Sequence, residues 1–344
     1  MKTYIPYSLL LAAAASGLAI GAETAYTTPV GYVSVGNTTG PAVPANTDFY
    51  VSIPGLDRPA EFAGLVASVS GSAIDIQGTP NLAALTGGIP YVAKITSGAK
   101  SGLLALITAN DSNTVTLAPQ PGESLSGIVS GDKIQVQKAW TPKSLFSGNL
   151  IPAGTQILAF SGASTGTNLA NDITYEFSAG AWLDLGTFGS ADDAVLYPNE
   201  GFILRTLSSV STFVVSGSVP LSNSRTIISN PVTSGQDNIL SFNSPVEETI
   251  GSSGLGVNTG DQVLVFDDLT TNGVVVAPGL NKASVVVLEY TAGMPGSWLD
   301  LGTFANATNT FFLKPGQSFV YRTAVGAPVG DTAWSDQPNY VPSL

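Results

Sequence analysis

This sequence contains tryptophan, aspartate and arginine twice in the same order. All three side chains can recognise a ligand. Trp182 and Asp184 lie in the segment Ala-Trp-Leu-Asp-Leu-Gly-Thr-Phe, residues 181–188, and Arg205 follows them. Residues 297–304 repeat that segment with only its first residue changed, and the second set is Trp298, Asp300 and Arg322. A planar guanidinium group can bind a carboxylate and also stack on an aromatic face. The two sets are therefore the candidate ligand-binding residues.

The spacing within each set indicates β-strands as the elements that position these side chains. Side chains alternate between the two faces of a strand, so Trp182 and Asp184 share one face. We predict that Asp184 pairs with Arg205 beside Trp182, and that Asp300 pairs with Arg322 in the same way. Such a trio can bind a sugar, or it can cap the core and fix the register of the strands. We favour the structural role, because duplicated motifs in β-sandwiches mostly hold the fold together.

Histidine and cysteine are both absent from the 344 residues. Their absence excludes Ser-His-Asp and Cys-His catalysis, histidine-ligated zinc and disulfide bonds. Two carboxylates facing each other across a cleft could still hydrolyse a glycoside. Asp184 and Asp300 belong to different copies of the repeated segment, however, so we do not expect them to meet. We therefore predict a non-enzymatic protein with no catalytic residues and no cofactor.

Two acidic doublets, Asp192-Asp193 and Asp267-Asp268, fall in expected loops. Calcium binds through several oxygen ligands on flexible loops. Neither doublet has the Asp-x-Asp-x-Asp-Gly spacing of a dedicated calcium loop. We interpret these residues as solvated turn residues and predict no metal ligands.

Composition indicates a folded β-protein. Gly and Pro number 38 and 22, 44% of residues are apolar, and only 10% are charged. β-branched residues fit strands, while Gly and Asn fit the tight turns between them. Lys and Arg total 12 against 24 acidic residues, which leaves no basic surface for nucleic acid.

The repeated segments belong to a longer internal duplication. Four matches follow one another in the same order in both copies, and residues 48–54 resemble the opening of the second copy at 237–245. The first copy contains an additional block of roughly 75 residues, as an insertion into a surface loop would. We expect a first repeat formed by residues 23–62 and 139–233, an insertion at 63–138, and a second repeat at 234–344.

The insertion has its own pattern of strands. Six short runs of alternating or β-branched residues are separated by Gly, Asn, Asp and Ser, and a closed barrel would leave such strands without exposed edges. We predict an all-β fold: two related antiparallel repeats, each sandwich-like or barrel-like, with the first interrupted by a small β-barrel. The expected barrel strands are residues 64–70, 73–77, 91–96, 103–108, 114–117 and 133–136.

The amino terminus is typical of an export signal. Met1-Lys2 is positively charged, Leu9–Ile20 is a run of small and apolar residues, and cleavage after Ala22 would leave Glu23 first. We expect residues 1–22 to be a signal peptide. No later stretch is apolar enough to cross a bilayer, so we expect no transmembrane segment after cleavage.

Several short motifs resemble an uncharacterised family of secreted proteins with many paralogues in Verrucomicrobia. The motifs span nearly the whole mature chain. The resemblance implies export and an all-β body, and it implies no activity, because that family has no assigned function. The residues that carry it are 28–35, 95–98, 107–110, 216–220 and 235–238, together with Trp334, Pro338 and Tyr340.

Two functions fit these features. The leading hypothesis is an exported structural or cell-surface protein that assembles with itself, located outside the cell, on its surface or in the periplasm. The alternative is a module that binds cell-surface polysaccharide or mediates adhesion. Exposed aromatic side chains in a groove would favour polysaccharide binding, whereas buried tryptophans and open strand edges would favour assembly.

Overall fold

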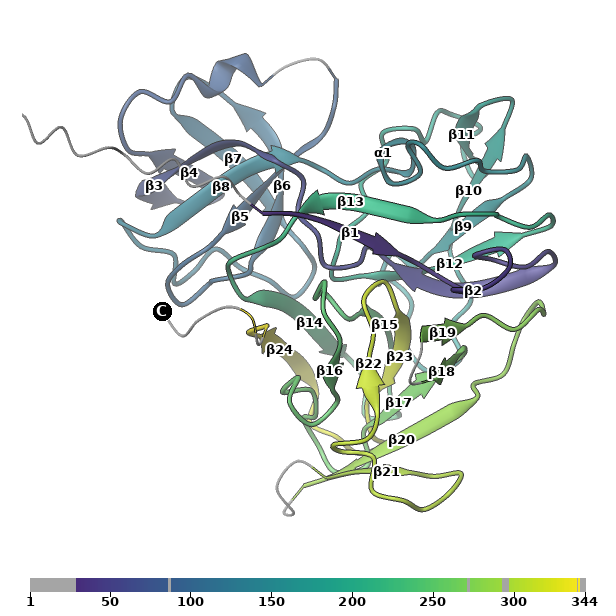
Figure 1. The fold of residues 1–344 in the computed structure, drawn as a ribbon. Helices are drawn as coiled ribbons and strands as arrows, with labels where there is room; N and C mark the ends of the chain where they lie inside the picture. The colour runs from purple at the N-terminus through teal and green to yellow at the C-terminus, as the bar shows by residue number, and fades with distance from the viewer. Residues whose placement is uncertain (1–28, 86–87, 271–272, 293–296, 339, 341–344) are drawn as a thin grey trace, which may run out of the picture.

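A computed structural model describes residues 29–85, 88–270, 273–292, 297–338 and 340 of the chain. The expected signal peptide, residues 1–22, lies outside the described residues. Within them the fold is almost entirely antiparallel β-structure, arranged as two related units and a small barrel (Figure 1). The predicted fold class is confirmed. No helix in the described part of the chain is long and apolar enough to span a membrane.

The first unit is a five-stranded sheet accompanied by a two-stranded sheet. The larger sheet has the order β11-β10-β9-β12-β2, and in the smaller one β1 pairs with β13. The strands are β1 (Val30–Ser34), β2 (Thr47–Ser52), β9 (Gln156–Ala159), β10 (Ile173–Ser178), β11 (Ala181–Asp184), β12 (Gly201–Thr206) and β13 (Val214–Ser218).

The second unit repeats this arrangement strand for strand. Its larger sheet has the order β21-β20-β17-β23-β15, and β14 pairs with β24. Strand pairing therefore places β14 in the second unit, although the sequence boundary at residue 233 assigned it to the first. The strands are β14 (Ser224–Asn230), β15 (Asp237–Ser241), β17 (Gln262–Val265), β20 (Val286–Thr291), β21 (Ser297–Asp300), β23 (Ser318–Arg322) and β24 (Gly330–Asp336).

The insertion forms a closed barrel with the order β3-β4-β7-β6-β5-β8. Each predicted strand is present, with its limits moved by a few residues. Alternate side chains fill the interior, where Val66, Ile74 and Ile134 are fully buried. The barrel strands are β3 (Ala60–Ser70), β4 (Ala73–Ile76), β5 (Tyr91–Ile95), β6 (Leu104–Asn110), β7 (Thr114–Pro119) and β8 (Lys133–Lys138).

Short elements complete the described fold. Thr141 caps the helix α1, accepting a hydrogen bond from the Ser144 amide, and proline follows at the first helical position. The remaining elements are the 3-10 helix η2 (Leu82–Ala84), α1 (Pro142–Leu145), β16 (Glu248–Thr249), β18 (Asp268–Thr270), β19 (Gly273–Val275) and β22 (Phe312–Leu313).

The two units contact each other through equivalent residues. The Ser52 amide of β2 donates to the Gly316 carbonyl at 3.0 Å. The equivalent amide of β15, that of Ser241, donates to the Asn199 carbonyl at 3.3 Å. Contacts exchanged in this way are the signature of an isologous interface, so the units are related by an approximate two-fold axis.

Gly201 and Ser318 mark the place where this axis passes. They occupy equivalent positions at the starts of β12 and β23, and they face each other. A Cβ atom added to Gly201 would lie 1.8 Å from Ser318 Oγ. Only a residue without a side chain fits opposite Ser318, so the two units differ where they meet.

The barrel is fastened to both units by ion pairs. Lys94 of β5 pairs with Asp57 at 2.7 Å, next to the first unit. Glu123 lies in the loop after β7 and accepts from Arg225 of β14 at 2.8 Å and from Lys100 at 3.2 Å. Barrel, first unit and second unit thus meet at one junction, with the loop 120–122 of the barrel packed against β14.

Candidate functional site

The two predicted tryptophans are core residues. Trp182 is 2% exposed and packs against Phe146 and Phe177, with ring centroids 5.2 and 5.4 Å away. Trp298 is 1% exposed and packs on Tyr290 at 5.2 Å. Neither ring is available as a platform for a sugar.

The predicted pairing of Asp184 with Arg205 is wrong. Arg205 donates to Asp48 through Nε at 2.7 Å and Nη2 at 2.8 Å. The order of the sheet explains the difference: Asp48 lies directly opposite Arg205 on the neighbouring strand β2, whereas β11 lies at the far edge beyond β9 and β10. Cross-strand neighbours are the side chains that meet in a sheet.

The second unit requires the same correction. Arg322 donates to Asp237, its cross-strand neighbour on β15, at 2.7 and 2.9 Å, and it does not bind Asp300. An asparagine from the opposite unit completes each pair. Arg205 Nη2 also donates to Asn281 Oδ1, and Arg322 Nη2 to Asn168 Oδ1, both at 3.0 Å; the Asn281 and Asn168 amides in turn donate to Asp48 and Asp237.

These pairs stabilise the interface between the units. Burial would by itself raise the pKa of Asp48, but the hydrogen bonds from Arg205 and the Asn281 amide, with the charge of Arg205, hold that pKa below its ordinary value. Since each capping asparagine comes from the other unit, loss of one pair weakens both the sheet and the interface.

Asp184 and Asp300 hold two identical turns. Asp184 accepts from the Gly186 amide at 2.8 Å and the Thr187 hydroxyl at 2.9 Å, and Asp300 makes the same two bonds in its own turn. Each turn presents a phenylalanine with positive φ: Phe188 at 56° and Phe304 at 57°, which are 81% and 76% exposed. A bulky residue in this conformation is uncommon. The duplicated motif therefore displays phenylalanine and buries tryptophan.

The acidic doublets are engaged with neighbouring groups. Asp192 accepts from the Trp182 amide at 2.8 Å and from Lys143 at 3.1 Å. Asp267 is buried and binds Lys282, so the interpretation as a solvated turn residue is wrong for Asp267. Across the described residues, no group of three or more acidic side chains is close enough to hold a metal ion.

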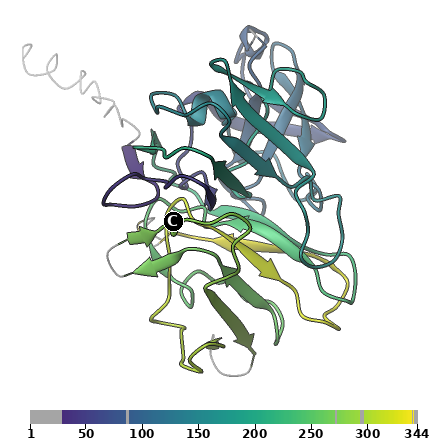
Figure 2. The same ribbon diagram turned by 90° about the vertical axis from the view of Figure 1, so that its right-hand side faces the viewer.

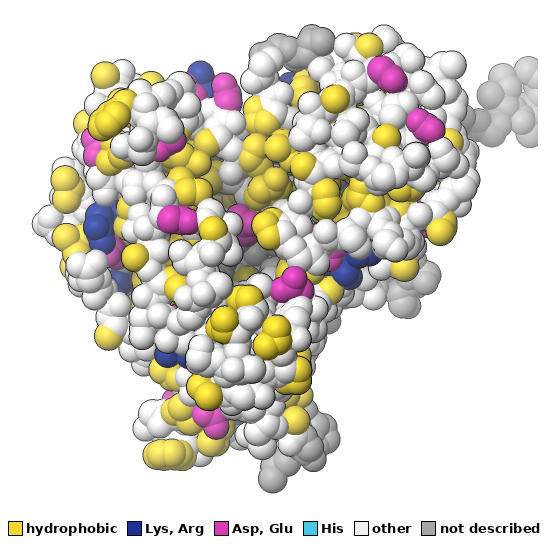
Figure 3. Space-filling model, turned by 180° about the vertical axis from the view of Figure 1, so that it is seen from behind, with side chains coloured by type: hydrophobic (Ala, Val, Ile, Leu, Met, Phe, Trp, Pro, Cys, Tyr) yellow, Lys and Arg dark blue, Asp and Glu magenta, His cyan; other side chains and the backbone are white. Residues whose placement is uncertain are grey.

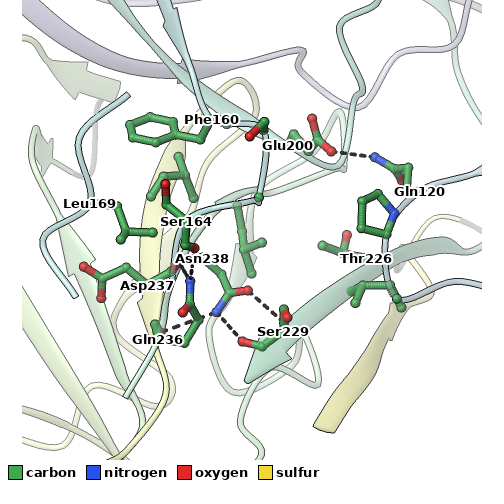
Figure 4. A pocket seen from close by; sticks show the side chains of 18 of the residues that line it. Gln120, Phe160, Ser164, Leu169, Glu200, Thr226, Ser229, Gln236, Asp237 and Asn238 are labelled. Atoms are coloured by element: carbon green, nitrogen blue, oxygen red, sulfur yellow. Dashed lines mark hydrogen bonds between the residues drawn. The ribbon is translucent and has the colours of Figure 1, made fainter. Parts of the chain in front are cut away.

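A cavity of about 190 Å³, here called the inter-unit pocket, lies at the junction of the barrel and both units. Figure 4 shows Phe160 and Leu169 on one side of it and Gln120 and Thr226 on the other, with Glu200 above and Gln236 below. Its walls come from the loops around residues 120–122, 160–172 and 199–201 and from β14 and β15.

A chain of hydrogen bonds crosses one wall of the inter-unit pocket. Asn199 Nδ2 donates to Gln120 Oε1 at 2.7 Å, and Gln120 Nε2 donates to Glu200 Oε1 at 2.7 Å. Burial raises the pKa of Glu200 to about 7, and the hydrogen bond from Gln120 offsets only part of that rise. Asn199 Oδ1 is buried and has no hydrogen-bond partner within the described residues. The wall thus combines a carboxyl group whose ionised form is disfavoured by burial with an acceptor that receives no hydrogen bond from the described residues.

A second, smaller cavity of about 130 Å³ occupies the equivalent place in the other unit. Here Tyr50 stacks on Phe266, with ring centroids 3.8 Å apart and planes 7° apart. The equivalents in the inter-unit pocket are Ile239 and Phe160, both of which line the cavity. Replacement of the tyrosine by isoleucine therefore leaves the face of Phe160 open to the pocket.

The molecular surface is sparsely charged, as the composition predicts. Seen from behind, hydrophobic side chains gather in the hollow between the barrel and the first unit, with isolated acidic side chains around it (Figure 3). No lysine or arginine lines the inter-unit pocket among the residues the structure describes, whereas Asp172, Glu200, Asp237 and Asp331 do.

Sequence reasoning did not single out Glu200, although the residue lies in one of the duplicated segments, 198–206. The available signal was a difference between the copies, since glutamine stands at the equivalent position 317. Similarity between repeats points to the shared core, and differences at aligned positions point to what one copy alone does.

Searches against protein-family models, curated proteins and solved structures give no match to this chain.

Proposed function

We propose that the protein is an exported, non-enzymatic binding protein whose inter-unit pocket takes one sugar residue of a glycan. Carbohydrates present hydroxyl groups around their rims and an apolar face of C–H groups. The pocket offers both kinds of surface. Amide, carboxyl and hydroxyl groups of Gln120, Glu200, Ser164 and Ser229 line it together with the phenyl ring of Phe160. Apolar walls with a few placed polar groups are typical of small-ligand sites.

The observation that carries this proposal is the difference between the two equivalent cavities. In the second one, Tyr50 covers Phe266 and fills the space against it. In the inter-unit pocket, Ile239 stands at the position of Tyr50 and the cavity stays open. A protein that needed these positions only for packing would gain from covering both phenylalanine rings, since an uncovered ring forfeits packing energy.

The variant Ile239→Tyr tests the proposal by copying the stacked tyrosine of the second cavity into the inter-unit pocket. The tyrosine would stack on Phe160 and occupy the cavity. Calorimetric titration with tetrasaccharides of glucose, N-acetylglucosamine and glucosamine should show binding to the parent protein and none to this variant.

The matched control is Tyr50→Ile, which makes the reverse exchange at the second cavity and should leave binding unchanged. Circular dichroism establishes that both variants are folded. A parent protein that binds none of the three tetrasaccharides, or an Ile239→Tyr variant that binds as well as the parent, would refute the proposal.

We also propose self-assembly through the two exposed turns, a second role that the exposure of Phe188 and Phe304 supports. These turns follow β11 and β21, which lie at opposite ends of the molecule (Figures 1 and 2). Two alike apolar tips at opposite ends allow each copy to contact two others, which generates chains. Exposed aromatic residues on rigid turns lose little entropy when they are covered.

Light scattering during size-exclusion chromatography tests this second role. We expect the parent to associate as its concentration rises, and the double variant Phe188→Ser with Phe304→Ser to stay monomeric. Substitution at Leu150, which is equally exposed but belongs to neither turn, serves as the control. A strictly monomeric parent at all concentrations would contradict assembly.

A further inference from the structure

The aligned positions around the two cavities differ in charge, and this difference bears on the chemistry of the ligand. The comparison rests on the proposed binding function of the inter-unit pocket. At several places a charged side chain in one unit stands opposite a neutral one in the other. Aligned pairs of this kind, first unit before second, are Ser161 with Asp267, Leu169 with Lys282, Asp172 with Val285, Tyr197 with Lys314, and Glu200 with Gln317.

Among the described residues, both charged side chains that line the second cavity, Asp267 and Lys314, have partners of opposite charge. Lys314 pairs with Glu247 at 2.7 Å. Lys282 donates to the buried carboxylate of Asp267 and also to the Ala277 carbonyl at 3.3 Å. Burial raises the pKa of Asp267 to about 6, and the charge of Lys282 and its hydrogen bond partly offset that rise. A carboxylate and an ammonium group are therefore paired inside this unit.

The inter-unit pocket has a carboxylate and lacks the ammonium. Leucine stands at position 169, where the second unit has its lysine, and the carboxylate is supplied by Glu200. The hydrogen bond that Glu200 receives there comes from the neutral amide of Gln120 at 2.7 Å. Asp172 and Asp331 add further negative charge to the walls, and no basic side chain lines them within the described ranges.

A carboxylate held in a partly dry cavity without a cation is costly, because the cavity replaces water with weaker dipoles. Asn199 Oδ1, beside Glu200, is a buried acceptor that lacks a donor in the described part of the chain. A ligand ammonium carries several N–H donors and one positive charge, so it can neutralise the Glu200 carboxylate and still offer donors to other acceptors of the wall.

We infer that the inter-unit pocket selects an amino sugar with a free, protonated amino group, which binds the Glu200 carboxylate. The sugar ring lies against Phe160 and Leu169, and the ammonium group points toward Glu200 and Asn199. An N-acetylated sugar lacks the charge and gains a bulky acyl group at the same atom.

Calorimetric titration of the full chain with glucosamine and N-acetylglucosamine tetrasaccharides tests this inference. The parent should bind the free amine more tightly. The isosteric variant Glu200→Gln keeps the acceptor for Gln120 and removes the charge, so it should weaken binding of the amine about tenfold or more. Binding of the N-acetylated form should weaken by a smaller factor, because that sugar brings no charge to pair with the carboxylate.

The control Asp331→Asn removes the same charge from another wall of the pocket and should weaken amine binding by less than about threefold. Equal affinity of the parent for amine and N-acetylated sugar, or an undiminished affinity in Glu200→Gln, overturns the selectivity while sugar binding itself stands. Absence of binding by every sugar tested overturns the binding function as well.

Discussion

Replacing Gly201 with alanine tests whether the two units meet at an approximate two-fold axis. The new Cβ atom would lie 1.8 Å from Ser318 Oγ, 2.7 Å from Ser318 Cβ and 3.0 Å from Ile239 Cγ2. Rotation of the serine hydroxyl relieves the first clash but not the second, because the Ser318 Cβ is fixed by the backbone of β23. Overpacking costs about 1–3 kcal/mol, and we expect the upper part of that range because the clash is with a backbone-fixed atom.

The measurement is urea unfolding followed by tryptophan fluorescence, together with the melting temperature. The loss corresponds to a fall in Tm of roughly 5 °C for a chain of this size. Adding Ser318→Gly removes the atom that the alanine strikes, so the double variant should regain stability, with a coupling of about 1 kcal/mol or more in a double-mutant cycle.

Gly189→Ala is the control, since its Cβ would meet no atom closer than 3.3 Å, the hydroxyl of Thr187. An alanine at 201 that costs nothing, or two substitutions whose effects simply add, would show that these residues do not oppose each other across the interface.

Three further predictions concern single side chains. Asp48→Asn should cost about 2 kcal/mol of stability at pH 7, because it breaks a mostly buried ion pair. The folded pKa of Asp48 lies below its ordinary value, so this stability is present above about pH 4 and is lost as the pH falls through the folded pKa. Urea unfolding should therefore show the stabilities of variant and parent converging in acid. Glu200→Gln should stabilise the protein at pH 8 by about 2 kcal/mol, less than the roughly 3 kcal/mol that a pKa of about 7 implies, because the side chain borders an open pocket. The parent loses this stability between the ordinary pKa of glutamate and the raised pKa of about 7, so the gain should vanish near pH 4 and be complete above pH 7, and a destabilised variant at pH 8 would contradict this. Phe188→Asn should raise the free energy of unfolding by about 0.5–1 kcal/mol, because asparagine tolerates positive φ better than phenylalanine does; an unchanged or lower urea midpoint would argue against strain in the turn.

The sequence allowed the architecture to be predicted because its signals are local. Each barrel strand is a run of alternating or β-branched residues between turn residues, and the duplication is visible as short matching segments. The predicted limits of the barrel strands were wrong by a few residues, because a strand ends where its pairing with the neighbouring strand ends and not where the residue type changes. Phe62, for example, extends β3 because Val136 of β8 lies opposite it.

The partners of the arginines could not be predicted, because they depend on which strands are neighbours. Asp184 is close to Arg205 in sequence, whereas Asp48 is separated from it by the entire barrel. Only the order of the sheet, with β2 next to β12, brings Asp48 to Arg205. The inter-unit pocket was missed for the same reason, since its walls combine three parts of the chain whose arrangement no local pattern encodes.

Fusion of two related units in one chain explains how such a pocket can exist on only one side of a nearly symmetric molecule. Two identical units would place serine against serine on the axis, as at position 318, or glycine against glycine, as at 201. The first pairing clashes and the second leaves a void. A single chain avoids both, and the same freedom lets Tyr50 cover Phe266 in one cavity while Phe160 stays uncovered in the other, beside Glu200. If Glu200→Gln proves more stable and binds the amine less well, the carboxyl group is a residue kept at the expense of stability, as expected of a functional site.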